Sequence, residues 1–423
     1  MNLDWRRLKA VVLESDDWGF CAWAPDEQAF RVLADTPSWR GPAGRIYGRS
    51  TLESAQDVDR IANALLEFRG GDGLPPIWQA NTIVAAPDFS RLTPPQFEVP
   101  ALPLVDLPDT PSRWQRSGMW QQVGKAIEVG VWWPELHGLH HVPESAWLRA
   151  LRRGIADARR AHEQQCVVCE AVEASGEYDP SEPAEDRSRN LELAFTKFRD
   201  LFGRAPTSLC APDYRWDESF EADAERLGVV TLQGRAEQAG HPLPRLRHLL
   251  HQFRWPDLQG RRFYLPPRIA FEPRGGHEPR GRLGPQVVQR RAREAWGRGQ
   301  PAVISTHRAN YAHLDPGWSE AGRGQLRDLL HLLVGEGAVF LTDFETRQLV
   351  ERGWSVRPIG SRGILLRHYG VPREPVRFPA PAGVTRVGLR DAGRRDEVRL
   401  GLEDGEVRAE VNPGEYLLEW RTD

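Results

Sequence analysis

The stretch that decides the fold is Ala10-Val11-Val12-Leu13-Glu14-Ser15-Asp16-Asp17-Trp18-Gly19, in which a short apolar run ends on two adjacent carboxylates. Such a run is typical of a buried strand, along which neighbouring side chains point in different directions. Two like charges also raise each other's pKa unless a cation lies between them. One arrangement that resolves both points has Asp17 bind a metal ion while Asp16 handles a proton. A simple turn after the strand is the alternative.

The chain of 423 residues has the composition of an ordinary globular protein, with 40% hydrophobic and 27% charged residues. Its formal net charge of -3 argues against a general nucleic-acid binder, which needs a basic surplus. The N-terminus shows no apolar signal segment, and no apolar stretch is long enough to span a bilayer. We therefore expect no nucleic-acid partner, no transmembrane segment and a cytoplasmic location.

Short apolar runs alternate with longer amphipathic ones from residue 9 to about 350, as in strands that feed helices. The predicted strands span residues 10–14, 78–84, 131–136, 208–211, 229–232, 262–265, 302–305 and 339–342. The predicted helices span 26–34, 54–68, 114–129, 144–161, 191–201, 217–227, 285–297 and 324–334. This number of strands favours a closed or nearly closed parallel barrel. A doubly wound sheet is the alternative, although no glycine-rich phosphate loop follows the first strand.

Three further stretches depart from this alternation of strands and helices. Residues 85–111 predict a long surface loop, and the acidic residues 163–190 predict an excursion or a flexible loop. After residue 356, the segments 384–389, 397–402, 407–411 and 416–420 alternate as strands between turn residues. We therefore expect a barrel domain over residues 1–355 and a small antiparallel β module over 356–423.

Histidines cluster after the third predicted strand, in His137-Gly138-Leu139-His140-His141. His137 and His141 are four residues apart, so on one helical turn both rings face the same side and suit one divalent ion. His140 would then point towards solvent or a supporting partner. A loop of partly exposed histidines is the alternative.

The strand predicted over 302–305 leads into His307. In a parallel barrel this strand end lies on the same face as those that carry Asp17 and His137. A histidine that is not itself a ligand suits the role of general acid there. Considered without its neighbours, His307 would more simply be a structural residue.

The strand predicted over 208–211 runs into Cys210-Ala211-Pro212-Asp213-Tyr214. Backbone N–H groups near Tyr214 could meet a developing oxyanion. Trp18 and Trp216 offer flat faces that stack on sugar rings, or else form a hydrophobic lid.

Taken in order, four motifs resemble those of the polysaccharide deacetylase family, which are metal-dependent enzymes on a distorted (β/α) barrel: Asp16-Asp17, His137-x-x-x-His141, Ala211-Pro212-x-Tyr214 and Ser305-Thr306-His307. The resemblance covers about residues 9–345. It implies a distorted (β/α)7–8 barrel and a hydrolase that removes an acyl group, N-acetyl foremost, from a sugar or glycan.

The resemblance also implies the role of each site residue. It makes Asp16 the catalytic base and His307 the catalytic acid, and it places Tyr214 near an oxyanion-hole N–H. The implied metal ligands are Asp17, His137 and His141. Such a set suits Zn²⁺ foremost, and Co²⁺, Ni²⁺ and Mn²⁺ are compatible with it.

Two positions depart from the family pattern. Gly138 stands where family members usually carry Ser or Thr, and Cys210 stands where they usually carry the arginine that orients the base. We expect Arg215 or Arg235 to replace that arginine.

Two other functions remain open. One is a different metal-dependent hydrolysis on the same barrel, of a non-sugar amide or of a glycosidic bond. A glycosidase needs a second carboxylate, for which Glu135 and Asp213 are candidates. The other is a glycan-binding protein without catalysis.

Overall fold

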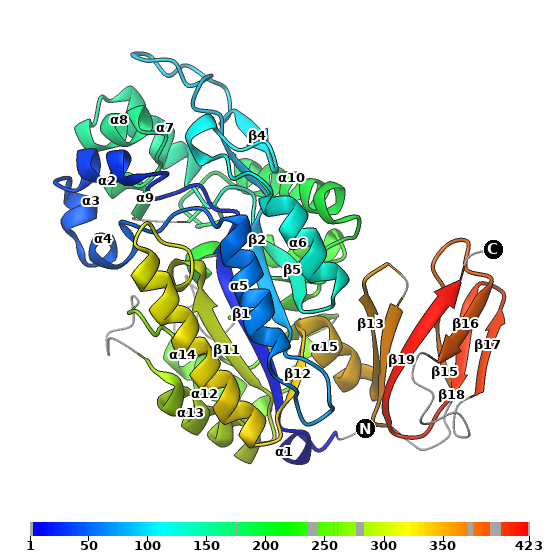
Figure 1. Ribbon diagram of the computed structural model, residues 1–423. Coiled ribbons are helices and arrows are strands. Elements are labelled where there is room, and N and C mark those ends of the chain that lie inside the picture. Colours follow the sequence, from blue (N-terminus) through cyan, green and yellow to red (C-terminus); the bar gives the residue numbers. More distant parts are fainter. Residues whose placement is uncertain are drawn as a thin grey trace.

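The computed structural model describes residues 3–173, 176–234, 244–256, 258–259, 261–275, 283–361, 363–370, 375–389 and 399–421. Its main sheet has ten strands in the order β10-β11-β1-β2-β5-β6-β7-β9-β8, with β12 paired to the start of β1. All neighbours run parallel except β8 and β9. Figure 1 shows this sheet curled, with helices around it. The predicted distorted (β/α) barrel is therefore confirmed, in the form of a half-barrel.

All eight strands predicted for the barrel are present in this sheet, and its two strands that the sequence did not predict, β8 and β10, have only two residues each. The strands of the main sheet are β1 (Ala10–Trp18), β2 (Trp78–Ile83), β5 (Trp132–Gly138), β6 (Ser208–Leu209), β7 (Thr231–Leu232), β8 (Leu258–Gln259), β9 (Arg262–Tyr264), β10 (Ile269–Ala270), β11 (Ala302–His307) and β12 (Val339–Leu341). A short antiparallel pair, β3 (Ala85–Pro87) and β4 (Leu104–Asp106), lies within the predicted surface loop.

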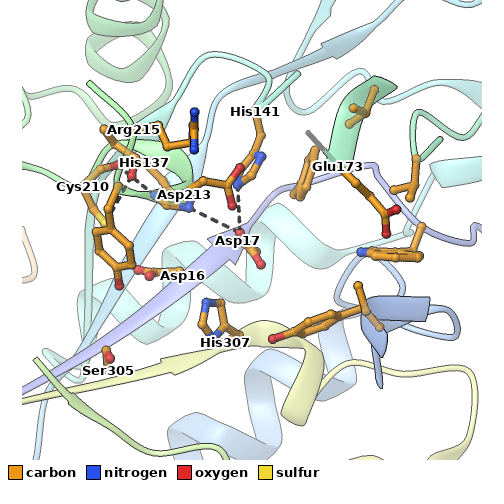
Figure 2. A pocket seen from close by; sticks show the side chains of 18 of the residues that line it. Asp16, Asp17, His137, His141, Glu173, Cys210, Asp213, Arg215, Ser305 and His307 are labelled. Carbon is orange, nitrogen blue, oxygen red and sulfur yellow. Dashed lines mark hydrogen bonds and ion pairs between the residues drawn. The ribbon is translucent and has the colours of Figure 1, made fainter. Parts of the chain in front are cut away.

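β1 lies in the middle of the sheet. Its residues 10–12 pair with β12 and residues 13–18 pair with β2, while β11 covers the opposite edge. A parallel strand that is covered on both edges and both faces reads as a continuous apolar run, which explains why this stretch stands out in the sequence. The carboxyl ends of β1, β5 and β11 meet at the cavity of Figure 2.

Helices follow most strands, as the sequence predicts. They are α1 (Trp5–Leu8), α2 (Glu27–Leu33), α3 (Pro37–Arg40), α4 (Pro42–Tyr47), α5 (Ala55–Leu66), α6 (Met119–Glu128), α7 (Glu144–Arg152), α8 (Ala156–Glu163), α9 (Glu170–Glu173), α10 (Ala184–Phe202), α11 (Glu218–Arg226), α12 (Pro244–Arg254), α13 (Pro285–Gly297), α14 (Pro316–Gly335) and α15 (Asp343–Arg352). The helix predicted over 144–161 is two helices, because Gly154 adopts φ +73° between them. No helix in the described part of the chain is long and apolar enough to cross a membrane.

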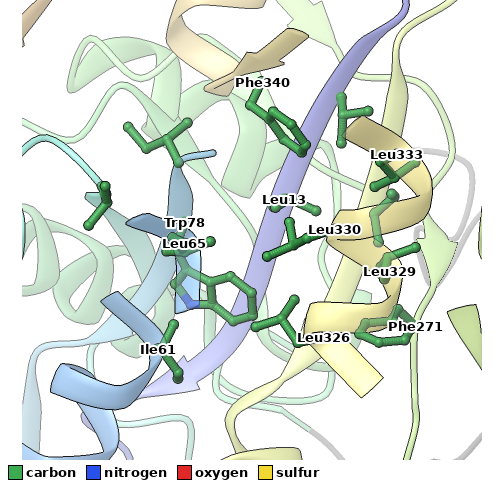
Figure 3. Close-up of a cluster of buried hydrophobic side chains, with 14 of the residues drawn as sticks. Leu13, Ile61, Leu65, Trp78, Phe271, Leu326, Leu329, Leu330, Leu333 and Phe340 are labelled. Atoms are coloured by element: carbon green, nitrogen blue, oxygen red, sulfur yellow. The ribbon is translucent and has the colours of Figure 1, made fainter. Parts of the chain in front are cut away.

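α14 packs against β1 and β2 to form the largest apolar cluster (Figure 3). It buries four leucines at helical spacing: Leu326, Leu329, Leu330 and Leu333. They share this cluster with Leu13 and Trp78. Burying side chains of this size contributes about 1.5–3 kcal/mol each, so this layer holds the central strands in register.

The acidic stretch 163–190, for which we expected an excursion or a flexible loop, is anchored by buried side chains in its described part. Between α9 and α10 it contributes three buried acidic side chains, Glu177, Asp179 and Glu182. Each accepts hydrogen bonds from backbone N–H groups, which is why acidic residues can be buried here. Sequence composition alone cannot distinguish such anchoring carboxylates from solvated ones.

The C-terminal part forms the expected antiparallel β module. One sheet has the order β13-β14-β19-β16 and the other β15-β18-β17, and their inner faces share an apolar core. The strands are β13 (Trp354–Ile359), β14 (Gly363–His368), β15 (Pro375–Pro379), β16 (Arg386–Leu389), β17 (Arg399–Glu403), β18 (Glu406–Glu410) and β19 (Gly414–Arg421). Residues 397–398 of one predicted strand lie outside the described residues. The division of the chain at 355/356 stays a prediction.

Candidate active site

A cavity of about 710 Å³ opens at the carboxyl ends of the barrel strands. Every predicted site residue lines it: Asp16, Asp17, His137, His141, Tyr214 and His307. Figure 2 shows Asp16 and Asp17, which share one strand, with His137, His141 and His307 around the same space. The lining contains no residue of the described C-terminal module.

Asp16 and Asp17 both reach this cavity because β1 carries a bulge. Ser15 pairs with Ala80 and Trp18 pairs with Thr82, so three steps on β1 oppose two steps on β2. Asp17 has φ +72°, in the left-handed region. The extra residue turns the side chain of Asp17 into the cavity, whereas strict alternation would have separated the two carboxylates.

A buried arginine holds this bulge from behind. The Arg308 side chain is 2% exposed and donates from Nε to the carbonyl of Asp17 (2.8 Å) and from Nη2 to that of Phe20 (3.2 Å). The Glu53 carboxylate accepts from the backbone N–H of Gly19 (3.0 Å). The strained backbone around Asp17 is thus fixed on both sides.

Asp17, His137 and His141 lie close enough together to hold a metal ion. The Asp17 Oδ1 lies 3.3 Å from His137 Nε2 and 3.6 Å from His141 Nε2. Two donors about 2.1 Å from one tetrahedral ion lie about 3.4 Å apart, so the spacing fits a zinc-sized ion. His137 Nδ1 is 2.8 Å from the carbonyl of Cys210, which makes Nδ1 the protonated nitrogen and leaves Nε2 to bind.

The two histidines do not share a helical turn, contrary to our expectation. His137 is in β5, and His141 follows in a tight turn over residues 138–141, the ligand turn, with φ +64°. The Phe20 ring stacks on His141, with centroids 4.5 Å apart. His140 is buried and points away from the cavity, with Nδ1 3.1 Å from Glu177 Oε2.

Among the described residues, the arginine that contacts Asp16 is Arg268. We predicted Arg215 or Arg235 for this place. Arg215 is wrong, and Arg235 lies outside the described residues. Arg268 Nη1 donates to Asp16 Oδ2 (2.6 Å) and Nη2 to Oδ1 (3.2 Å). Arg215 instead pairs with Asp179. Arg268 stands just before β10, a strand too short to be recognised, so its approach to Asp16 had no local signal in the sequence.

The environment of Asp16 holds it as an anion. Asn81 Nδ2 donates to Oδ1 (2.6 Å), and the Arg268 guanidinium also contacts Glu14. Burial alone would raise the pKa of Asp16, but the charge and hydrogen bonds of Arg268, together with the charges of His137 and His307, lower it to about 2. Burial likewise opposes ionisation of Asp17, whose pKa the neighbouring His137 and His141 nevertheless lower.

His307 is paired with a carboxylate that the sequence analysis did not identify. Its Nδ1 lies 2.5 Å from Glu272 Oε1, and Asn310 Nδ2 donates to Oε2 of the same carboxylate (2.8 Å). Burial would lower the pKa of His307, but the charge of Glu272 raises it to about 10. The register of β1 and β11 places His307 directly beside Asp16, so a proton donor and a proton acceptor lie on adjacent strands.

Tyr214 presents its hydroxyl group to Arg268 Nη1 (2.6 Å). Its backbone N–H donates to the carbonyl of Ala211 (3.1 Å). Asp213 and Tyr214 both adopt positive φ in the short 3₁₀ turn Pro212–Tyr214. The side chain of Tyr214 is therefore linked to Asp16 through Arg268.

The tryptophans expected to stack on sugars are core residues. Trp18 and Trp216 are only 2% and 1% exposed and pack within apolar clusters. The aromatic wall of the cavity consists of Phe20, Trp23 and Tyr47. The last two stack with centroids 6.1 Å apart. They come from the segment between β1 and α5, which the strand-end reasoning did not search.

Of the two candidate glycosidase carboxylates, Asp213 lines the cavity and Glu135 is buried behind it. Glu135 accepts from the N–H groups of Thr207 (2.7 Å) and Ser208 (3.0 Å). Glu135 therefore has a structural role, anchoring the start of β6.

No family model matches the chain, and no curated protein is similar to it. Solved structures with similar folds include the carbohydrate deacetylase Agd3, at 9% identity and TM-score 0.40 over 98% of this chain and 65% of that one. They also include the Xyl-CE4 domain of a multidomain xylanase from the hindgut metagenome of Trinervitermes trinervoides (10%, TM-score 0.34, 82% and 91% covered). An α-fucosidase from Thermotoga maritima is similar as well (13%, TM-score 0.35, 100% and 97% covered). At these low values, the function has to be inferred from the chain's own site.

Proposed function

We propose that the chain is a metal-dependent hydrolase that removes an acyl group, N-acetyl foremost, from a sugar or glycan. The observation that carries this proposal is the composition of one cavity. A two-histidine, one-carboxylate donor set lies there beside a base that is kept ionised and an acid that is kept protonated. Hydrolysis of an amide by an activated water uses all three functions, because the carbonyl must be polarised, the water must lose a proton and the leaving amine must gain one.

The ion would be held by Asp17, His137 and His141. Zn²⁺ suits this set best, and Co²⁺, Ni²⁺ and Mn²⁺ are compatible. When bound, it would supply Lewis-acid activation of the acyl carbonyl and of the attacking water. A Lewis acid fits the chain's own chemistry, since neither Asp16 nor His307 contributes a nucleophile.

The chain's own residues account for the proton transfers. Asp16, held by Arg268 and Asn81, takes the proton of the attacking water. As the C–N bond breaks, His307 gives its proton to the leaving nitrogen, and the products are a carboxylic acid and a free amine. The adjacent register of Asp16 and His307 supports the division of these two steps between them.

Tyr214 is the proposed contact for the developing oxyanion. Its N–H would have to leave the Ala211 carbonyl to serve, whereas its hydroxyl already lies beside Arg268. Tyr214→Phe removes only the hydroxyl and therefore distinguishes the two groups. Unchanged kcat assigns the role to the backbone, and loss of kcat assigns it to the side chain.

The experiment that tests the function combines metal removal with a substrate screen. We expect the purified protein to contain a divalent ion, to lose acetyl release from N-acetylated amino sugars after chelation, and to recover it when Zn²⁺ is added back. Chromogenic glycosides and non-sugar amides are screened alongside, so glycosidic or other amide hydrolysis would be seen directly. A protein that binds no metal and keeps its activity in chelator would overturn the proposal. The cytoplasmic location stays a prediction.

A further inference from the structure

The ligand turn places His141 in a conformation that needs support. Its φ of +64° lies in the left-handed region, which residues other than glycine rarely adopt. The imidazole must nevertheless stay near Asp17 to complete the donor set. Contacts that hold the backbone of this turn therefore decide whether the third ligand is in place before a metal arrives.

Backbone N–H groups of Val84 and Ala85 bind the carbonyl of Leu139, and a single buried carboxylate binds the N–H groups of the turn. The two oxygens of Glu177 accept from three consecutive N–H groups, those of Leu139 (2.7 Å), His140 (2.8 Å) and His141 (2.7 Å). Glu177 is 1% exposed and comes from the segment between α9 and α10. It is not among the described residues that line the cavity, so it acts on the site only through the turn.

Gly138 provides the space that this carboxylate occupies. A Cβ added at Gly138 would lie 2.4 Å from Glu177 Oε1 and 3.2 Å from Pro212 Cγ. The first distance is too short for a non-bonded carbon–oxygen pair, so a side chain at 138 would displace the carboxylate of Glu177 from this position. The glycine that departs from the family pattern thus matches a buried acidic residue 39 positions later in the chain.

We propose that Glu177 is a positioning residue for the metal site, which fixes His141 through the backbone of the ligand turn, and that Gly138 is required to admit it. This inference rests on the proposed function, because it concerns the same metal ligands. It adds a supporting contact that neither the motifs nor their spacing indicate. The pairing makes the turn rigid in the metal-free protein.

The test measures the affinity of the metal-free protein for Zn²⁺ by competition with a chromogenic chelator. Glu177→Gln keeps the size of the side chain but turns an amide NH₂ towards backbone donors, so the turn loses part of its anchor. We expect the Kd for Zn²⁺ to rise about 10- to 100-fold, as for the loss of other groups that orient metal ligands. His137→Ala, which removes a ligand, should abolish binding.

Glu182→Gln is the matched control. Glu182 lies in the same segment, is also buried, and accepts from the N–H groups of Ser145 (2.7 Å) and Ala146 (3.2 Å). It therefore anchors the start of α7 and not the ligand turn. Its variant should lose thermal stability while keeping the Zn²⁺ affinity of the wild type, with each Kd measured well below the Tm of that protein.

A second pair of variants tests the role of Gly138. Gly138→Ala should displace the Glu177 carboxylate and weaken Zn²⁺ binding as Glu177→Gln does. In a Glu177→Ala background the same change should cost little further affinity, because the space is already free. If Glu177→Gln does not fold, Gly138→Ala decides the question by itself.

The outcomes separate this inference from the proposed function. The inference is wrong if Glu177→Gln or Gly138→Ala binds Zn²⁺ as tightly as the wild type. It is also wrong if either variant binds Zn²⁺ no more weakly than Glu182→Gln. Both results would leave the proposed function intact. Fully additive losses from Glu177→Ala and Gly138→Ala would overturn the mutual exclusion. A wild-type protein without Zn²⁺ affinity would overturn the proposed function and this inference together.

Discussion

The two halves of the cavity are held in place by different kinds of contact. In the half that carries the proposed metal ligands (Asp17, His137 and His141), the groups that support Asp17 and His141 bind the backbone. Arg308 binds the carbonyl of Asp17, and Glu177 binds the N–H of His141. In the acid–base half (Asp16 and His307), the partners are side chains that bind side chains.

The difference fits the roles that we propose for the two halves. A ligand has to be in the right place, so its backbone is fixed, even in a left-handed conformation. A proton carrier has to be in the right protonation state, so an opposite charge is placed beside it. Asp16 and Asp17 are neighbours in sequence, yet they belong to different halves.

The largest expected effect separates these two carboxylates. Asp17→Asn should remove both bound metal and turnover, because a charged ligand is lost. Asp16→Asn should keep the metal and lower kcat by about 10²- to 10⁴-fold, the usual effect of losing a general base. Metal content by mass spectrometry and kcat for acetyl release measure the two effects. Asp213→Asn, which changes another cavity carboxylate, should keep the metal, and equal metal loss in the Asp16 and Asp17 variants would contradict the division.

The next effect concerns Arg268, the cation that contacts Asp16. Arg268→Gln removes a hydrogen-bonded charge, which should lower kcat by about 10- to 100-fold. It should also raise the pKa of Asp16 from about 2, so the acidic limb of the rate profile moves to higher pH. The stability that Asp16 contributes is present above its unfolded pKa of about 3.9 and lost as pH falls towards 2. A pH–rate profile measures this shift, with Arg215→Gln as the control. If the acidic limb does not move in Arg268→Gln, Arg268 does not lower the pKa of Asp16.

A smaller effect is expected at the acid. Glu272→Gln removes the charge that raises the pKa of His307 to about 10, so His307 should lose its proton at lower pH. The alkaline limb of the pH profile of kcat/KM then moves to lower pH. Activity at pH 9 falls by about tenfold, while activity near pH 6 changes little. Glu173→Gln, which removes a carboxylate from the same cavity but leaves the His307–Glu272 pair intact, should keep the wild-type profile. An alkaline limb that stays in place in Glu272→Gln would exclude His307 as the acid.

The smallest effect lies outside both halves. Trp23→Ala removes part of the aromatic wall and should raise KM by about 2- to 10-fold, the range for an aromatic contact. Metal content and kcat should stay unchanged. Trp216→Phe, in the core, should alter the free energy of unfolding and not KM. A Trp23 variant with lower kcat and the wild-type KM would show that this wall acts on chemistry and not on binding.

The sequence was enough to predict much of the barrel and the residues that line its cavity, because the patterns that mark them lie within short stretches of the chain. Apolar runs mark the strands, and polar residues that follow them fall at one end of a parallel sheet. The bulge at Asp17 and the left-handed turn at His141 could not be predicted this way. Both are conformations that residues such as Asp and His adopt only when other parts of the chain hold them.

By itself, the sequence determined the fold class and the identity of Asp16, Asp17, His137, His141, Tyr214 and His307 as the residues gathered in the cavity. Only the tertiary structure decided which groups support them. Arg268 lies 252 residues from Asp16, and Glu272 and Glu177 stand in irregular segments without strand or helix periodicity. The physical reason is that a strand end is set by local periodicity, whereas a buried charge is matched to its partner by contacts formed after the chain has folded.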